Sequence, residues 1–143
     1  MVGATLMKLT DEERGWVQAQ LAVVDRFVGD YGAEPVAGGL EGVDHAWASW
    51  LRHTPHPAGD DADTIINAIA VALGQSVVDA LDGFMWVTVF QDGETDLGVT
   101  GLPGVDALFL PAEIVALEYA AGNPSFLVQT RDHYIASIND LRA

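Results

Sequence analysis

The sequence has no cysteine and very few basic residues. Among its 143 residues, 6 are Lys or Arg and 21 are Asp or Glu, which gives a formal net charge of −15 with histidine neutral. The missing cysteines exclude a disulfide scaffold, a thiol enzyme and any zinc or iron–sulfur site that needs a thiolate. The scarcity of Lys and Arg excludes a polybasic nucleic-acid binder. Because half of the residues are hydrophobic, we expect a single domain with its own core over 1–143.

The chain also lacks the patterns of a signal peptide and of a membrane span. Residues 1–15 hold one lysine, Lys8, followed by three consecutive acidic residues instead of an apolar run. The longest uncharged segment, Thr64–Val78, is shorter than the roughly 20 apolar residues of a spanning helix and contains polar residues. We therefore predict a soluble, cytoplasmic protein that makes no membrane contact.

Basic residues are missing above all from the middle of the chain. No Lys or Arg lies between Arg52 and Arg131, whereas carboxylates recur from Asp60 to Glu118. Such a surface repels nucleic acid and anionic lipid, and it attracts cations or basic proteins. Excess carboxylate that only keeps the protein soluble would produce the same pattern.

Residues 10–82 are predicted to form a helical half, after a loosely ordered start over residues 1–9. Thr10 and Glu13 have the spacing of a capping box, and a long amphipathic stripe follows them. A later helix, beginning near Asp60, is apolar over most of its surface and should be the most buried one. Because Gly74 costs about 1 kcal/mol relative to Ala inside a helix, we expect another backbone to approach closely there.

Residues 83–143 are predicted to form a sheet and the last helices. The hydrophobic period changes to two, which indicates strands over 84–90, 95–101 and 106–110 joined by tight turns such as Asp92-Gly93. The expected fold is therefore α+β: a three-stranded antiparallel meander with helices packed on one face. Two to three helices would precede the sheet, and two would follow it.

Four short segments of this half occur in a familiar order. They are Leu73-Gly74 on an apolar helix, the strand Met85–Val89, the turn Asp92-Gly93 and the strand end Phe109-Leu110-Pro111. Together they resemble the bacterial domain of unknown function numbered 3806 (DUF3806), over roughly residues 63–141. The resemblance implies an α+β fold and brings no activity and no catalytic residue with it.

The best candidate for a metal site is a polar loop before the apolar helix. His53, His56, Asp60 and Asp61 lie within nine residues there, and imidazole with carboxylate suits Zn²⁺ or Mn²⁺. The same residues also fit a loop stiffened by proline whose acids cap the following helix. No nucleophile elbow, phosphate loop or dinucleotide fingerprint is present, so we expect no cofactor and no catalytic set.

Trp47 and Trp50 are a candidate contact for a partner. They lie three residues apart on a short helix beside the polar loop, and exposed tryptophan next to carboxylates is typical of interface hot spots. Burial in the core explains the same pair, since tryptophan is usually well buried.

These observations favour a non-catalytic interaction protein, an adaptor or immunity-like module that docks a basic protein. One alternative is a metal-dependent hydrolase that uses His53, His56, Asp60 and Asp61. Another is a small-molecule sensor with a pocket between Trp47, Trp50 and the sheet. A homodimer through a free edge of the sheet is a further expectation, because a three-stranded sheet has two edges to cover.

Overall fold

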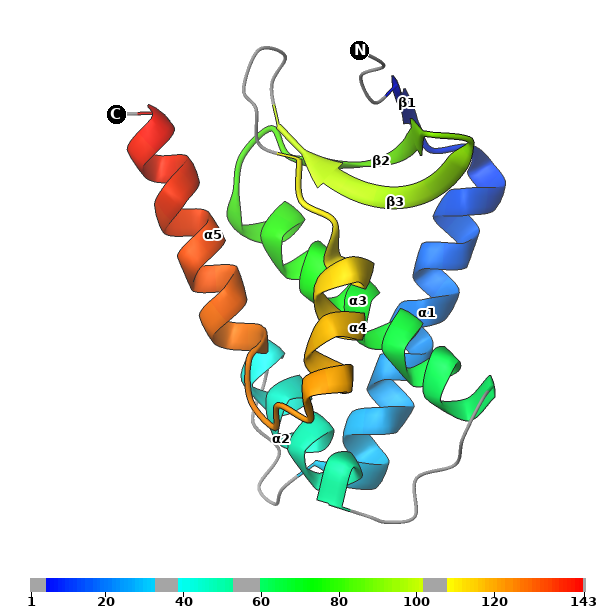
Figure 1. Ribbon diagram of the computed structural model, residues 1–143, viewed down its shortest axis with the longest axis vertical. Coiled ribbons are helices and arrows are strands. Elements are labelled where there is room, and N and C mark those ends of the chain that lie inside the picture. The colour runs from blue at the N-terminus through cyan, green and yellow to red at the C-terminus, as the bar shows by residue number, and fades with distance from the viewer. Residues whose placement is uncertain (1–4, 33–38, 53–59, 102–107, 143) are drawn as a thin grey trace.

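The computed structural model of the chain describes residues 5–32, 39–52, 60–101 and 108–142. These residues form a sheet at one end of the molecule and helices that lie on one side of it (Figure 1). In chain order the elements are β1 (Thr5–Lys8), α1 (Asp11–Tyr31), α2 (Gly39–Arg52), α3 (Asp60–Ala80), β2 (Met85–Gln91), β3 (Glu94–Thr100), α4 (Pro111–Ala121) and α5 (Leu127–Arg142). No helix in the described ranges is both long enough and apolar enough to cross a bilayer.

The predicted α+β class and the three-stranded antiparallel sheet are confirmed. The sheet has the order β1-β2-β3, so β2 is the central strand and β1 and β3 are the edges. Three helices precede the β2–β3 hairpin and two follow it. The hairpin turns at Asp92 (φ 52°) and Gly93 (φ 78°), the pair of left-handed residues that the Asp-Gly signal predicts.

The identity of the third strand corrects the sequence prediction. A strand was expected over 106–110, and a loose start over 1–9. Instead Thr5–Lys8 forms β1, with Thr5 opposite Phe90 and Lys8 opposite Val87. Phe109 makes one isolated bridge to Val99, and residues 1–4 and 102–107 lie outside the described part of the chain. The segment Thr5–Lys8 is too short to show the alternation of a strand, and its partner β2 is about 80 residues away in the sequence. No local pattern could therefore predict this pairing.

Helix α3 forms the centre of the core, as its apolar sequence predicts. It contacts each of the other four described helices as well as β2 and β3. Ile69, Leu73 and Val77 on this helix are completely buried. The helix therefore carries the sheet on one part of its surface and the helical layer on the rest.

The sheet is anchored on α3 by the contact between Trp86 and Gly74. A Cβ atom at Gly74 would lie 2.3 Å from Cη2 and 2.7 Å from Cζ2 of the Trp86 indole. The indole N–H donates to Oε1 of Gln75 at 3.0 Å, so both the ring and its polar atom are engaged by α3. The expectation of a backbone neighbour at Gly74 is therefore wrong, because an aromatic ring occupies the space.

This contact predicts opposite effects for two Gly→Ala changes inside helices. Gly74→Ala should lower the free energy of unfolding by about 1–3 kcal/mol, because the new methyl group displaces the Trp86 ring. Gly29→Ala on α1 meets nothing within 4 Å and should raise the free energy of unfolding by up to about 1 kcal/mol. Urea denaturation measures both changes. A Gly74→Ala protein as stable as the parent would contradict the assigned contact.

The N-terminus of α5 is capped by an aspartate from another helix. Asp44 on α2 accepts hydrogen bonds from the backbone N–H groups of Phe126 (3.3 Å), Leu127 (3.0 Å) and Val128 (3.0 Å). On the same helix, the Trp47 indole N–H donates to the carbonyl oxygen of Asn123 at 2.8 Å. Helix α2 therefore holds the connection between α4 and α5 in place. The sequence offered no signal for this cap, because the residues involved are more than 80 positions apart.

Removing this cap should destabilise the protein. Asp44→Ala leaves three N–H groups without their acceptor and should lower the free energy of unfolding by about 2 kcal/mol. Asp44→Asn keeps one side-chain oxygen and should lose less than Asp44→Ala. Asp140→Ala, an exposed change at the other end of α5, is the control and should stay within about 0.5 kcal/mol of the parent. Equal effects of Asp44→Ala and Asp140→Ala in urea denaturation would contradict the role of Asp44.

Candidate functional site

The candidate metal loop falls largely outside the described residues. His53 and His56 belong to the segment 53–59, which the structure does not describe. Asp60 and Asp61 begin α3, but their side chains also lie outside the description. Among the described residues there is no group of three or more His, Asp or Glu side chains that could hold a metal ion. The metal-dependent hydrolase therefore stays a prediction.

Of the two interpretations of Trp47 and Trp50, a partner contact or burial in the core, the structure supports burial. Their exposed fractions are 0% and 3%. The centroids of the two indole rings lie 5.4 Å apart, Phe126 is 5.6 Å from Trp47, and Tyr119 is 5.7 Å from Trp50. Rings from α4 and the start of α5 cover this face of α2, which no local pattern on α2 could reveal. Within the described ranges, neither indole offers a surface to a partner, and neither lines any of the hollows described below.

The exposed tryptophan is Trp16 on α1, which is 41% exposed. It flanks a hollow of about 290 Å³, lined also by Glu13, Thr88, Thr95, Asp96 and Leu97, which we call the α1–β3 hollow. Phe90, 40% exposed, lies directly opposite Thr95 in the hairpin and adds an apolar neighbour. The Trp16 indole thus lies at the surface, in a hollow that it shares with the Glu13 carboxylate.

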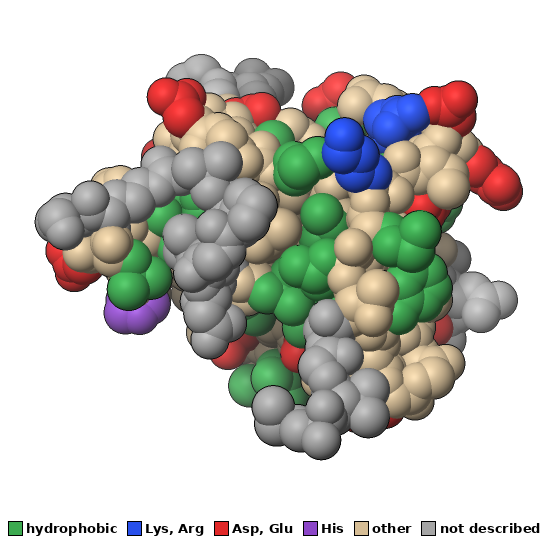
Figure 2. All heavy atoms as spheres, turned by 90° about the horizontal axis from the view of Figure 1, so that it is seen from above, with side chains coloured by type: hydrophobic (Ala, Val, Ile, Leu, Met, Phe, Trp, Pro, Cys, Tyr) green, Lys and Arg blue, Asp and Glu red, His purple; other side chains and the backbone are tan. Residues whose placement is uncertain are grey.

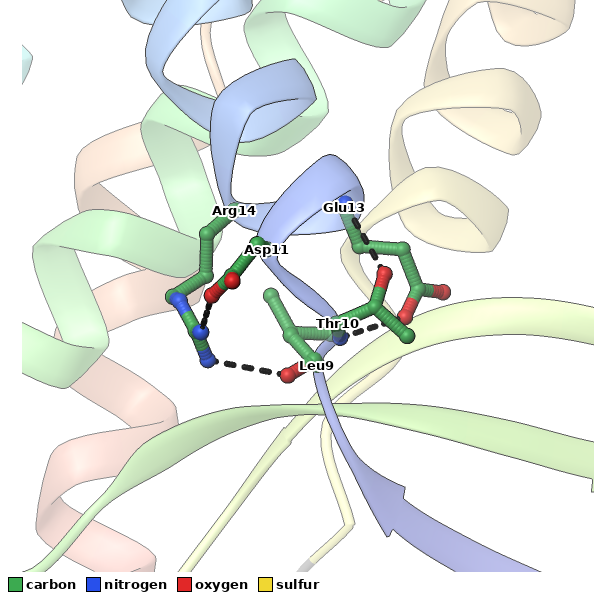
Figure 3. A network of polar contacts seen from close by, with 5 residues as sticks. All are labelled: Leu9, Thr10, Asp11, Glu13 and Arg14. Carbon is green, nitrogen blue, oxygen red and sulfur yellow. Dashed lines mark hydrogen bonds and ion pairs between the residues drawn. The ribbon is translucent and has the colours of Figure 1, made fainter.

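Glu13 is held in this hollow by contacts from two elements. Thr10 and Glu13 form the predicted capping box: the Thr10 N–H donates to Oε1 of Glu13 at 2.8 Å, and the Glu13 N–H donates to the Thr10 hydroxyl at 3.1 Å (Figure 3). The Thr88 hydroxyl on β2 donates to Oε2 of Glu13 at 2.7 Å. The first turn of α1 is therefore tied to the central strand through one carboxylate.

These hydrogen bonds also favour the ionised form of Glu13. The backbone N–H of Thr10, followed by the hydroxyl of Thr88, holds the pKa of the Glu13 carboxyl below its usual value of 4.5. Glu13 is thus ionised at neutral pH, and its position makes it a fixed anion beside Trp16. A carboxylate next to an exposed indole suits a cationic side chain, which gains both an ion pair and a cation–π contact.

A second hollow lies at β3, on the other side of this strand from the α1–β3 hollow. It measures about 290 Å³ and is formed by the β2–β3 turn together with Leu110 and Glu113 at the beginning of α4. We call it the hairpin hollow. Its lining includes Asp92, Glu94 and Asp96, and Asp96 and Thr95 line both hollows. Five carboxylates, from α1, the β2–β3 hairpin and α4, therefore lie at β3, and none of the described residues lining either hollow is Lys, Arg or His.

The outer edge of β3 is free at Thr95–Leu97 within the described part of the chain. Val99 uses its outward N–H and C=O groups in the bridge to Phe109, with both N···O distances at 2.8 Å. Because outward groups alternate along an antiparallel strand, Thr95 and Leu97 point the same way as Val99. Asp96 Oδ1 accepts the Leu97 N–H at 2.8 Å. An unpaired strand edge thus runs between two acidic hollows.

Comparison with known proteins identifies no relative of this chain. No protein-family model, no curated protein and no solved structure matches it. The resemblance to DUF3806 is therefore neither supported nor contradicted and stays a prediction. The function has to be inferred from the geometry of the site itself.

The lowered pKa of Glu13 predicts how stability depends on pH. A carboxyl with a lowered folded pKa adds stability above its unfolded pKa, near 4.5, and this contribution is lost as pH falls through the lower folded value. Glu13→Gln should therefore lower Tm near neutral pH, and the difference from the parent should vanish in acid. Glu12→Gln, an exposed neighbour in the same turn, is the control. Equal Tm curves for the Glu13→Gln protein and the parent from about pH 7 to about pH 3 would contradict the assignment.

Proposed function

We propose that this protein is a non-catalytic interaction module, of an adaptor or immunity-like kind, that docks a basic segment of a partner protein at β3. The observation that carries the proposal is the convergence of five carboxylates around a strand edge that is unpaired among the described residues, beside the exposed Trp16. They are Glu13, Asp92, Glu94, Asp96 and Glu113. No basic residue among the described lining residues offsets these carboxylates.

Charge complementarity selects a basic partner over other proteins. The net charge of −15 attracts cations to the protein as a whole. Because carboxylates occur on every described helix, this attraction alone does not select one face. At the β3 edge the carboxylates accompany an exposed aromatic side chain and two concave hollows. The hollow that holds Asp25 and Asp79 has no aromatic residue in its described lining. A lysine or arginine entering the α1–β3 hollow would pair with Glu13 and stack on the Trp16 indole.

The strand edge determines how the partner would bind. An extended segment that adds to β3 would use the outward backbone groups of Thr95 and Leu97, with Asp96 releasing the Leu97 N–H. Its side chains would alternate between the two faces of the sheet, one into the α1–β3 hollow and the next into the hairpin hollow. Because both hollows are acidic, the best segment carries basic residues at consecutive positions.

The same charges affect self-association. Two copies that paired through β3 would bring their carboxylates together, which is unfavourable. The homodimer expected from the sequence would therefore have to use the edge of β1, whose only charged side chain is Lys8.

Binding of a fluorescein-labelled hexa-arginine peptide tests the proposal. We expect binding that weakens by about fivefold or more between about 0.05 M and 0.5 M salt, because exposed charges are screened. Glu113→Lys should weaken binding by about tenfold, since it reverses a charge in the hairpin hollow. Glu41→Lys, an exposed change on α2 with the same effect on net charge, is the control and should weaken binding less than about twofold.

Two results would contradict the proposal. The first is an equal loss of peptide binding in the Glu113→Lys and Glu41→Lys proteins, which would mean that only the net charge attracts the peptide. The second is unchanged binding in Trp16→Ala, which would exclude the α1–β3 hollow from the contact.

A further inference from the structure

A second type of cavity lies at the opposite end of the sheet, beside β1. It measures about 290 Å³ and lies between the end of β1, α1, α3 and the beginning of β2. Most of its lining is apolar, with Val17, Phe84 and Trp86 exposed by only 3%, 6% and 9%. The volume is at the lower limit of small-molecule sites, and the combination of apolar lining with a few polar groups is typical of them. We call it the β1 pocket.

The β1 pocket contains two cations in a chain that has only six. Lys8 and Arg14 both line it, and none of its described lining residues is Asp or Glu. On the face seen from the sheet end, Lys and Arg side chains lie beside hydrophobic ones (Figure 2). The pocket therefore has the opposite charge from the two hollows at β3.

The two cations differ in how they are engaged. Arg14 donates to the Leu9 carbonyl oxygen at 2.9 Å and pairs with Asp11 (Figure 3). Lys8 has no ion pair and no side-chain hydrogen bond within the described residues. In a chain with 21 acidic residues, an unpaired lysine at an apolar pocket is available to an anion from outside.

We propose that the β1 pocket binds a small amphipathic carboxylate. The tail of the ligand would contact Val17, Val78 and Phe84, and its carboxylate would pair with Lys8 at the rim. Because the Trp86 N–H is already donated to Gln75, the indole offers the ligand its ring alone. A neutral ligand gains only the apolar contacts, and a cationic ligand meets the repulsion of the unpaired Lys8.

Three probes with the same tail and different head groups test the proposal: octanoate, octanol and octylamine. Binding to the ¹⁵N-labelled protein is followed by backbone chemical shifts. We expect octanoate to bind about fivefold more tightly than octanol, with the largest shifts at residues lining the pocket, and we expect octylamine to bind most weakly there.

Two substitutions separate the pocket from nonspecific binding. Lys8→Gln should reduce the octanoate affinity about fivefold and leave octanol unchanged. Arg26→Gln removes an exposed positive charge elsewhere on α1 and should not change the octanoate affinity. Met85→Trp, at a residue that is 41% exposed and lines the pocket, should block all three probes without disturbing the core.

The proposal is overturned if octanoate causes no chemical-shift changes at the pocket. It is also overturned if octanol or octylamine binds as tightly as octanoate, or if the Lys8→Gln protein binds octanoate as tightly as the parent does. None of these results involves β3, so they leave the proposed docking of a basic segment untouched.

Discussion

The position of Trp86 on Gly74 is the contact on which the rest of the structure depends. A Cβ atom at Gly74 would lie 2.3 Å from Cη2 of the Trp86 indole, so the ring fills the space that a larger residue would need. Through this contact the central strand of the sheet packs on the most buried helix. Because β2 carries both edge strands, its position on α3 also determines where β1 and β3 lie. The hydrogen bond from Thr88 to Glu13 then ties α1 to the same strand. The hollows at β3 and the pocket at β1 are formed around this one anchored strand.

Features with a local signal could be predicted from the sequence, whereas features whose partner is distant in the chain could not. The capping box at Thr10, the Asp92-Gly93 turn and the buried face of α3 are each determined within a few residues, and all three are confirmed. The β1 strand and the Asp44 cap both depend on residues about 80 positions away, and neither could be predicted. Gly74 was recognised as a close approach, but its neighbour could not be identified from α3 alone.

The candidate site was predicted only in its overall charge. The stretch without Lys or Arg contains Asp92, Glu94 and Asp96, which line the hollows at β3. Glu13 lies outside the stretch without Lys or Arg, and nothing in the sequence indicates that its carboxylate lies beside those of β3. Of the two interpretations of Trp47 and Trp50, burial in the core holds, because rings from α4 and from Phe126 before α5 cover them, whereas Trp16 is exposed. Which side of an amphipathic helix lies at the surface depends on how many elements pack around it, and this information is not local.

The central claim is that the acidic edge of β3 receives a basic segment. Its most direct test is a titration of the ¹⁵N-labelled protein with an unlabelled hexa-arginine peptide, followed by amide and indole chemical shifts. We expect the largest shifts at Thr95, Leu97 and the Trp16 indole N–H. Small shifts spread evenly over the acidic residues of all helices, with none at β3, would contradict it.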